Sequence, residues 1–436
     1  MHNRDPFGGI RIIKWNSEIE ALPMTLPVRS LIGNTADHDP MERTSMKMKL
    51  TFIALLMFSV SAVWASSGEA TIETILDKAR ETGSSGIVVL KDGEVLAEWL
   101  AETDGEPIET MSVTKSVLAL GVARMLTTGE LKSLDTPVAE IFPEWRQGRK
   151  AEITIRHLLN HTSGLQNHPN AGKEIYPSPD VVRLALAAEL EHAPGEHFAY
   201  NNKATNLVAG LFEPLTGRDA AAYIGQELLA PLGIEEWRWM RDNAGNPYGM
   251  AGLQLHPHDL ARLGQLVIDR GQAGGKVLID DRVLEVFLAA GSELSQAVGL
   301  LWWRQPDWQR WVIDTESLAK LRDAGVDADF LTRLQAAEGS YDSIAELHGA
   351  LAAALDDDWR EQVRALVMSR GLSVSRTERS DKVVAYYGDG YLGQYLVVVP
   401  ETGIVGVRMI RRFDGIGPEH GFPEFRKLIS GLREES

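Results

Sequence analysis

The sequence predicts an α+β fold in which one antiparallel sheet is built from segments near both ends of the 436-residue chain. Two apolar runs joined at Asp92-Gly93 form a predicted hairpin over residues 86–99, because Asp-Gly favours a tight turn between strands. A second predicted hairpin covers residues 395–410 and turns at residues 400–403. Helical patterns occupy much of the sequence between them, so we expect helices to flank the sheet.

Apolar residues at helical spacing predict an all-helical lobe between the two hairpins. The expected helices cover residues 112–126, 155–160, 180–191, 206–216, 219–229 and 257–270, and a closing helix covers residues 423–432. Residues 299–303 are predicted to form a strand. Alternation along this strand directs one of Trp302 and Trp303 into the core and leaves the other free to face a cleft.

Residues 305–380 differ in character from the rest of the chain, because leucines recur at helical spacing among many alanines and aspartates. We predict that they form a helical insertion between two strands of the sheet. One domain would then comprise residues 66–304 and 381–436. A lid, a dimer surface and a structural decoration are all open interpretations of the insertion.

Residues 46–65 have the pattern of a secretory signal peptide, with Lys47 and Lys49, an apolar core and a small residue, Ala65, at the cleavage point. The alternative is a membrane anchor, but spanning a bilayer takes about 20 apolar residues. We therefore expect cleavage near Ala65, an exported protein (periplasmic or secreted) and no stable membrane span after cleavage. Residues 1–45 are predicted to be a disordered leader or the product of a mis-called start.

Charge and composition argue against several classes of function. The chain has 44 Lys and Arg against 61 Asp and Glu, a net charge of −17, and so acidic a surface repels nucleic acids and anionic membranes. It has no cysteine, which excludes disulfides, Cys-ligated zinc and thiol catalysis. With 44% hydrophobic and 24% charged residues, the composition is that of a globular protein, long enough to bury the core of an enzyme.

A candidate nucleophile lies at the start of the first long helical pattern. Ser112 and Lys115 are three residues apart, so their side chains share one face of a helix. A serine hydroxyl needs a nearby proton acceptor, and a buried lysine with a lowered pKa supplies one. The same spacing recurs at Ser317 and Lys320 inside the acidic insertion, where we interpret it as a solvated helix face.

Two further motifs complete the constellation. Tyr200-x-Asn202 is the only Tyr-x-Asn among nine tyrosines, and a phenol held near an ammonium group can act as a general base. The glycine-rich segment 388–395 leads directly into the second hairpin, where a strand edge can offer a backbone N–H to an oxyanion. Taken alone, Tyr200 is also consistent with a tyrosine that packs its ring in the core. The glycine-rich segment, taken alone, is also consistent with a plain turn.

In this order and spacing, the motifs resemble the serine β-lactamase-like hydrolases, a group that includes class C β-lactamases, D-Ala-D-Ala peptidases, family VIII esterases and 6-aminohexanoate-oligomer hydrolases. Residues 134–143, 153–165 and 253–263 are similar to further segments of the group, and the resemblance covers roughly residues 70–303 and 383–432. It implies a β-lactamase/transpeptidase-like fold and an active site between the sheet and the helical lobe.

The resemblance also implies residue roles. Ser112 would be the acylated nucleophile, Lys115 its proton partner and Tyr200 the general base, while Asn202 would orient the substrate or Lys115. The backbone N–H groups of Ser112 and Tyr391 would form the oxyanion hole. Whether Lys115 or Tyr200 takes the first proton stays open, because coupled groups titrate as a unit.

The third-strand motif departs from that of the lactamases, which carry Lys-Thr-Gly or His-x-Gly there to hold a substrate carboxylate. Here the aligned residues are Gly388, Asp389 and Gly390, and Asp389 repels a carboxylate at close range. The run from Gly390 to Gln394 looks more like the esterase and amide-oligomer hydrolase branch.

We therefore expect an exported serine hydrolase that cleaves an ester or amide of a small molecule or peptide through a Ser112 acyl-enzyme. The alternatives are a penicillin-recognising D-Ala-D-Ala peptidase or class C-like β-lactamase, and a catalytically silent binding protein on the same scaffold.

Other polar residues carry weaker predictions. His157 and His161 are four residues apart, a spacing that can bind a metal on a helix, but no third ligand is evident nearby and a structural role is favoured. We expect no metal and no organic cofactor. Gln166 and His168 follow the turn after His161 and are predicted substrate contacts.

Overall fold

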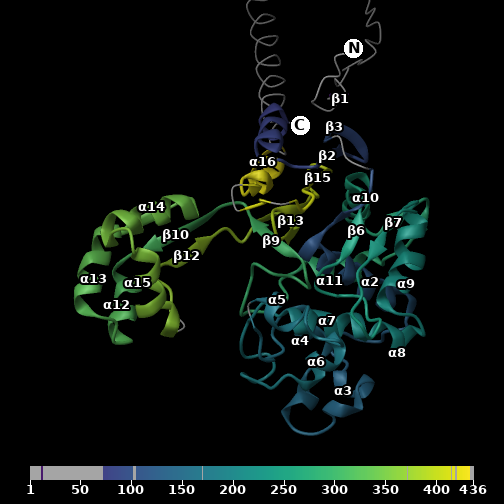
Figure 1. Ribbon diagram of the computed structural model, residues 1–436, viewed down its shortest axis with the longest axis horizontal. Helices are drawn as coiled ribbons and strands as arrows, with labels where there is room; N and C mark the ends of the chain where they lie inside the picture. The colour runs from purple at the N-terminus through teal and green to yellow at the C-terminus, as the bar shows by residue number, and fades with distance from the viewer. Residues whose placement is uncertain are drawn as a thin grey trace, which may run out of the picture. The chain divides into compact units, whose positions relative to one another are not determined.

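The computed structural model describes residues 11–12, 72–101, 105–168, 170–370, 372–413, 415–417 and 420–432. The predicted signal peptide (46–65), and the predicted leader (1–45) except for residues 11–12, lie outside these ranges. The described residues divide into two compact units, both drawn in Figure 1. The main unit runs up to Trp303 and resumes at Tyr386, and the second unit is Arg304–Ala385.

Seven strands of the described chain form one sheet in the order β1-β3-β2-β15-β14-β13-β9. In that order their bounds are Arg11–Ile12, Glu94–Leu100, Gly86–Lys91, Ile404–Met409, Gln394–Val399, Val383–Gly390 and Trp303–Pro306. β2 is antiparallel to β15, with Gly86 opposite Met409. The first and last hairpins therefore lie side by side, which confirms the prediction of a sheet built from both ends of the chain.

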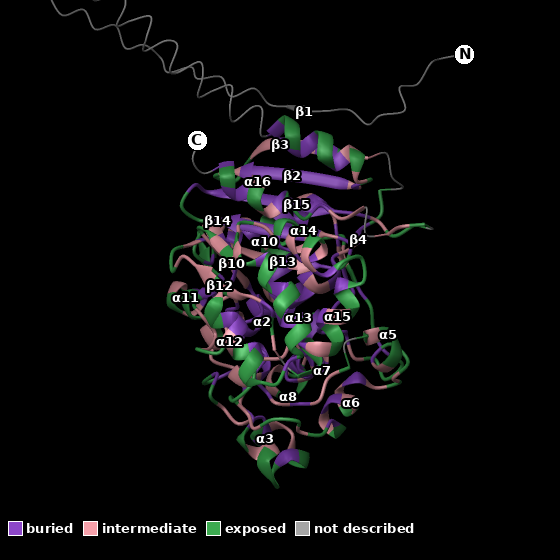
Figure 2. Cartoon of the chain, turned by 90° about the vertical axis from the view of Figure 1, so that its left-hand side faces the viewer, coloured by how far each residue is buried: buried purple, intermediate pink, exposed green. Residues whose placement is uncertain are grey.

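Helices cover both faces of the central strands, and β14 and β15 are buried along their whole length. A Cβ on Gly264 of α10 (Pro257–Ile268) would lie 2.5 Å from Val405 Cγ1. A Cβ on Gly406, the next residue of β15, would lie 2.6 Å from Ile429 of α16 (Phe425–Gly431). Because successive residues of a strand point to opposite faces of its sheet, α10 and α16 cover opposite faces of the seven-stranded sheet. Figure 2 shows β2 and β15 in the purple of buried residues.

The helices of the main unit enclose the rest of its core. Besides α10, α16 and helical residues 72–81, they are α2 (Thr114–Thr128), α3 (Val138–Ile141), α4 (Ile155–Leu159), α5 (Ala171–Glu174), α6 (Val181–Ala187), α7 (Asn202–Gly210), α8 (Phe212–Thr216), α9 (Ala220–Ile224) and α11 (Asp281–Leu288). Short strands pair as β4-β6-β5 (Ile108–Glu109, Leu253–Leu255, Arg238–Trp239) and as β7-β8 (Gln272–Ala273, Lys276–Val277). No helix of the described residues is long and apolar enough to cross a bilayer.

Several predicted elements differ from the observed ones. The helix predicted over 206–216 is divided into α7 and α8, because Pro214 has no N–H to bond the carbonyl of Gly210. The helix predicted over 180–191 already ends at Ala187. The strand predicted over 299–303 begins only at Trp303, since Leu301 has a left-handed backbone (φ 60°) that interrupts an extended chain.

The second unit has its own core, which includes Phe330 and Leu334, both fully buried. Its helices are α12 (Thr315–Asp323), α13 (Ala328–Leu334), α14 (Ile344–Leu355) and α15 (Trp359–Leu366). Three short strands, β11 (Gly339–Tyr341), β10 (Gln309–Ile313) and β12 (Arg376–Arg379), form an antiparallel sheet in that order. The prediction for 305–380 included only helices, because such short, half-exposed strands lack a clear alternating pattern.

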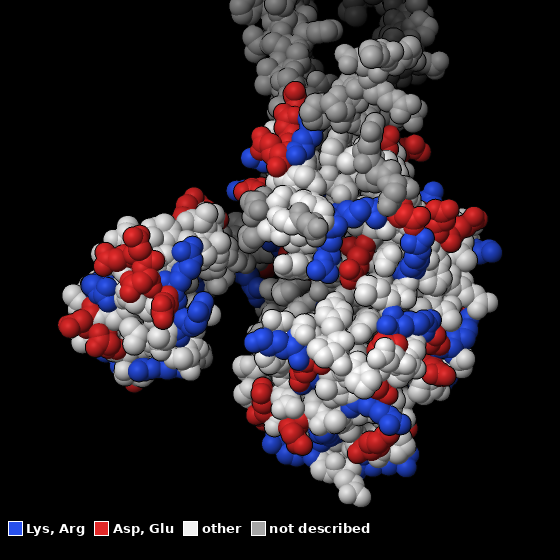
Figure 3. All heavy atoms as spheres, in the orientation of Figure 1, with Lys and Arg blue, Asp and Glu red and all other residues white. Residues whose placement is uncertain are grey.

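Acidic and basic side chains alternate on the face of the second unit that Figure 3 displays. Ion pairs join Arg376 to Asp314 at 2.7 Å and Lys320 to Glu316 at 2.9 Å.

Candidate active site

Ser112 lies in a tight 3-10 turn, Met111–Val113, directly before α2. Met111 has a left-handed backbone with φ of 49°, a conformation that is uncommon for a residue other than glycine. Such strained positions are found most often at functional sites. The turn places Ser112 at the N-terminal end of a long buried helix, where backbone N–H groups lack intrahelical partners.

Lys115 is one turn further along and is only 3% exposed. Its Nζ donates a hydrogen bond of 3.0 Å to Ser112 Oγ and another of 2.7 Å to the carbonyl oxygen of Met250. Burial lowers the pKa of Lys115, and the neighbouring Tyr200 opposes this shift. The neutral amine is therefore populated at a lower pH than in an exposed lysine.

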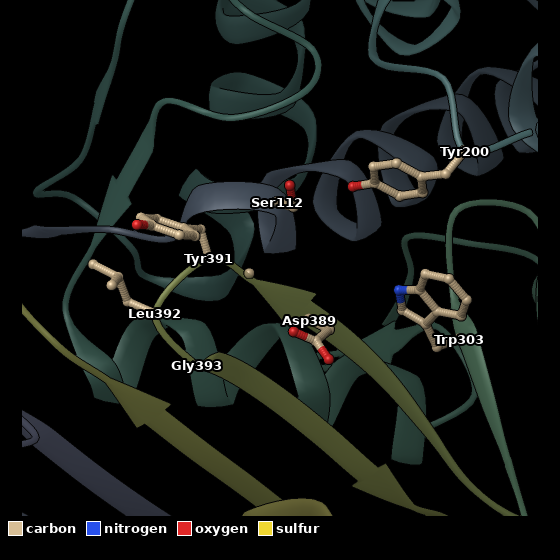
Figure 4. A pocket seen from close by; sticks show the side chains of 8 residues that line it. Ser112, Tyr200, Trp303, Asp389, Tyr391, Leu392 and Gly393 are labelled. Atoms are coloured by element: carbon tan, nitrogen blue, oxygen red, sulfur yellow. The ribbon is translucent and has the colours of Figure 1, made fainter. Parts of the chain in front are cut away.

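Tyr200 reaches the same point from a loop that precedes α7. Its ring centroid lies 4.9 Å from Lys115 Nζ. Figure 4 shows the hydroxyl group of Tyr200 pointing toward Ser112. The loop is fixed at both sides of the tyrosine: Asn167 Nδ2 donates to the Tyr200 carbonyl at 2.9 Å, and Asn201 caps α7 by accepting from the N–H of Ala204 at 3.0 Å. The structure thus brings Ser112, Lys115 and Tyr200 together.

His161 is buried behind the tyrosine, with its ring centroid 4.7 Å from that of Tyr200. Its Nδ1 accepts the backbone N–H of Asn201 at 3.2 Å. Burial, helped by the positive charge of Lys115, lowers the pKa of His161 to about 3. A neutral imidazole therefore supports the tyrosine loop. His157 instead accepts the backbone N–H of Thr154 at 3.2 Å, in the cap of α4.

Two glycines allow β13 to approach the serine turn closely. A Cβ on Gly388 would lie 2.9 Å from Val113 Cγ1 and 3.0 Å from Ser116 Oγ. A Cβ on Gly390 would lie 2.8 Å from the carbonyl oxygen of Thr110. Side chains at either position would push the strand away from the turn that contains Ser112, so the glycine-rich character of this segment has a packing cause.

The turn after β13 is held by a buried arginine. Leu392 and Gly393 both have left-handed backbones (φ 70° and 78°), and Arg408 on β15 donates to the carbonyl oxygens of both, at 2.8 Å for Gly393. Burial lowers the pKa of Arg408 to about 10, opposed by Tyr395. The side chain of Gln394 exchanges hydrogen bonds with the backbone of Ile410, accepting its N–H at 3.0 Å. The shape of the turn next to Tyr391 therefore depends on Arg408 and Gln394.

Sequence reasoning missed Arg408 and the supporting position of His161. A lone arginine within the otherwise apolar or glycine run 404–409 was the available signal for the first. For His161, the sequence favoured a structural role over metal binding but did not identify the tyrosine loop as its contact.

Two cavities meet at Ser112. The larger, of about 440 Å³, is lined by the residues that Figure 4 draws: Ser112, Tyr200, Trp303, Asp389, Gly390, Tyr391, Leu392 and Gly393. The smaller one lies further inside and adds Lys115 and His161 to Ser112, Tyr200, Trp303 and Asp389. The cavities thus bring a hydroxyl, an amine, a phenol and a carboxylate together.

Aromatic rings form one wall of the site. The ring of Trp303 stacks on Tyr200, with centroids 6.2 Å apart, and on Tyr387, with centroids 6.3 Å apart. Trp302 is fully buried in the core. Trp303 lines both cavities, whereas Trp302 lines only the smaller one. Trp302 precedes β9, so alternation along a strand does not account for this difference.

The remaining predicted site residues lie elsewhere. Asn202 is the first residue of α7, and no hydrogen bond within the described chain joins it to Lys115. Gln166 and His168 line neither cavity, and His168 is exposed, accepting the N–H of Asn170 at 3.0 Å. Their roles toward a substrate stay predictions.

Comparison with known proteins identifies a family for this chain and a curated relative of part of it. The Beta-lactamase family matches residues 69–428. Esterase EstB of Burkholderia gladioli is 32% identical over 204 residues, which cover 39% of this chain and 52% of EstB. The chain therefore spans about half the length of this curated relative.

Solved structures share the fold at low identity. EstCE1, described as a hydrolase with promiscuous acyltransferase activity, superposes with a TM-score of 0.54 at 15% identity, covering 84% of this chain and 98% of that one. D-alanine carboxypeptidase AmpC from Burkholderia cenocepacia superposes with a TM-score of 0.51 at 16% identity, covering 84% and 99%. The predicted β-lactamase/transpeptidase-like α+β fold is confirmed.

Proposed function

The chain belongs to the beta-lactamase family, and we propose that it is an exported serine hydrolase that cleaves an ester or amide through an acyl-enzyme on Ser112. The observation that carries the proposal is the 3.0 Å hydrogen bond between Lys115 Nζ and Ser112 Oγ, made by a lysine that is almost fully buried. The hydroxyl of Tyr200 is directed to the same point (Figure 4).

In the proposed acylation step, Ser112 Oγ attacks the carbonyl carbon of the substrate while its proton passes to Lys115 and Tyr200. The lowered pKa of Lys115 favours the neutral amine that this transfer requires. Because the neutral amine of Lys115 and the phenol of Tyr200 lie side by side, we propose that the pair acts as one proton acceptor. The pair then returns the proton to the leaving group as the tetrahedral intermediate collapses.

The backbone N–H groups of Ser112 and Tyr391 are proposed to stabilise the oxyanion of that intermediate. Two observations support this assignment: Ser112 is at the end of a helix where N–H groups are available, and Tyr391 is in the turn that Arg408 holds. Water then hydrolyses the acyl-enzyme by the same proton route. Asn202, Gln166 and His168 are proposed to orient the substrate.

Asp389 favours this assignment over the peptidase or lactamase alternative. It lies in the cavity lining, where a negative charge repels the carboxylate that penicillins and D-alanyl peptides carry. The convergence of Ser112, Lys115 and Tyr200 argues against a catalytically silent binding protein, because such groups are effective only as a unit.

Hydrolysis of p-nitrophenyl butyrate tests the proposal. Ser112→Ala is expected to abolish turnover without loss of the fold, whereas the matched variant Ser317→Ala, at the second Ser-x-x-Lys, keeps the wild-type rate. Undiminished activity of Ser112→Ala would refute the assignment. In a parallel incubation with a penicillin, rapid formation and turnover of an adduct on Ser112 would establish the lactamase alternative instead.

Export and domain organisation are separate proposals. Intact mass of the protein recovered from the periplasm or the medium should correspond to a chain that begins just after Ala65. A deletion of residues 305–380 is expected to leave a folded, ester-hydrolysing domain, since the second unit has its own core. An insoluble product would contradict the interpretation as an insertion.

A further inference from the structure

Among the residues that the structure describes, one carboxylate lines the larger cavity. Asp389, near the end of β13, is a lining residue of both cavities that contain Ser112. The other side chains around the larger cavity are hydroxylic, aromatic or aliphatic. A substrate that enters this cavity therefore meets one formal charge on its lining, and that charge is negative.

The carboxylate is only partly neutralised by the protein. Arg426 of α16 places Nη1 3.5 Å from Asp389 Oδ2. Its guanidinium is also 4.5 Å from the ring centroid of Tyr387, and Arg426 lines neither cavity. The arginine therefore approaches Asp389 from outside the cavity. Lys115, the other cation nearby, donates to Ser112 and to Met250.

Burial raises the pKa of Asp389, and Arg426 opposes this shift. Burial thus makes the ionised carboxylate more costly than in water, and a second cation on the cavity side would offset part of that cost.

An aromatic face lies beside the carboxylate. Trp303 lines both cavities, and its ring is nearly parallel to that of Tyr200, at an interplanar angle of 16°. Trp303 and Tyr200 both line the larger cavity, and aromatic rings attract nearby cations, most strongly where water is excluded. Figure 4 shows Trp303 and Asp389 on the same side of the cavity, opposite the serine turn.

We propose that Asp389 and Trp303 form a subsite for a positively charged group of the substrate, such as a primary or quaternary ammonium. The inference rests on the proposed function, because the subsite selects among substrates of Ser112. It predicts cationic esters or amides as the preferred substrate class.

Matched ester pairs that differ in one charge test the subsite. Butyrylcholine and 3,3-dimethylbutyl butyrate have the same shape, and the former carries a cation on the leaving group. p-Nitrophenyl 6-aminohexanoate and p-nitrophenyl heptanoate test the acyl side in the same way. For at least one pair, the wild-type protein is expected to show about tenfold or higher kcat/KM for the charged member.

Asp389→Asn removes the charge at nearly constant shape, and the ratio between charged and neutral esters should fall toward one. Glu401→Gln removes an exposed carboxylate from the turn between β14 and β15 and should leave the ratio at its wild-type value. The subsite would be overturned if the ratio of kcat/KM between charged and neutral esters were the same in the wild-type protein and in Asp389→Asn. It would also be overturned if the wild-type protein preferred the neutral member of both pairs.

Inhibition of the wild-type protein gives a test that needs no variant. With 3,3-dimethylbutyl butyrate as substrate, n-butylammonium should inhibit at about tenfold lower concentration than n-butanoate, and equal or stronger inhibition by butanoate would overturn the proposal. Hydrolysis of neutral esters without any charge preference would overturn the subsite alone. Absence of hydrolysis of all four esters, together with an unmodified Ser112 after a fluorophosphonate, would overturn the hydrolase assignment and the subsite with it.

Discussion

The chain contains the pattern Ser-x-x-Lys twice, and the two copies have different surroundings. At the first, Ser112 lies in a 3-10 turn before α2, and Lys115 is 3% exposed with its amine on Ser112 Oγ. At the second, Ser317 belongs to the cap of α12, and the side chain of Lys320 is 67% exposed.

The second copy uses its polar groups for local structure. Ser317 Oγ accepts the backbone N–H of Asp314 at 2.8 Å, while the Asp314 carboxylate accepts the N–H of Ser317 at 2.9 Å. The hydrogen bond from the Ser317 N–H, together with a second one from Arg376, lowers the pKa of Asp314 to about 2. Lys320 pairs with Glu316 one turn back. The serine already has its partners, and its lysine is directed to solvent.

The comparison shows that the Ser-x-x-Lys spacing alone does not bring a buried amine to the serine hydroxyl. What distinguishes the first copy is burial of the lysine, together with a tyrosine delivered from a separate loop. Burial shifts the amine toward its neutral form, and this shift is what a proton acceptor for serine requires.

The largest expected contrast is between the two lysines. Lys115→Ala should lower kcat/KM for p-nitrophenyl butyrate by about 10³-fold, because it removes a proton acceptor from a unit that acts together. Lys320→Ala should change kcat/KM by less than about twofold, since an exposed helix pair contributes little. Equal losses in the two variants would break the comparison.

The pH dependence of ester hydrolysis by the wild-type protein tests the same contrast. A lowered pKa means that Lys115 loses its proton at a lower pH than an exposed lysine, so kcat/KM should rise with pH to a plateau at a midpoint below 10.5, the ordinary value for lysine. A midpoint at or above 10.5 would contradict the role of burial.

The next largest effect is expected at the turn that contains Tyr391, beside Ser112. Among the described residues, Ser317 has no such turn beside it. Arg408→Met should lower kcat by about 10- to 100-fold, because the carbonyl groups of Leu392 and Gly393 lose their donor and the turn next to Tyr391 is displaced. The rates are compared at a temperature well below the Tm of each protein. A variant with lowered Tm but unchanged kcat would limit Arg408 to a structural role.

A smaller effect is expected from the buried histidine. Unfolding raises the pKa of His161 from about 3 to its ordinary 6.5, so the unfolded chain gains a proton as pH falls below 6.5. The contribution of His161 to stability is therefore present above pH 6.5 and is lost as pH falls toward 3. Between pH 7 and pH 5 the loss is on the order of 2 kcal/mol in the free energy of unfolding.

Urea unfolding at the two pH values measures this loss. His161→Asn removes the titrating group and keeps a side chain that tolerates a left-handed backbone. The variant should lose less stability than the wild-type protein between pH 7 and pH 5. The same pH dependence in both proteins would show that His161 is not the group responsible.

The smallest effect belongs to the second serine. Ser317→Ala deletes one acceptor of the α12 cap and should cost about 0.5–1 kcal/mol of stability in the second unit, with no change in ester hydrolysis. A loss of activity without loss of stability would mean that the two copies had been assigned the wrong way round.

Local patterns were sufficient to predict the hairpins, the sheet built from both ends and the spacing of Ser112 and Lys115. Other features depend on residues far apart in sequence. The carbonyl of Met250, which accepts from Lys115, is 135 residues away, and no periodicity identifies it. The use of Arg408 to hold a turn and of His161 to support a tyrosine loop likewise follows from tertiary packing.

The central claim is that burial of Lys115 beside Tyr200 makes Ser112, and not Ser317, nucleophilic. Mass spectrometry of the protein after a fluorophosphonate measures this directly, because the reagent forms a stable adduct with an activated serine. The expected result is one adduct, on the peptide that contains Ser112, which forms far more slowly in Lys115→Ala. An adduct on Ser317, or an unmodified Ser112 in the folded wild-type protein, would contradict the account.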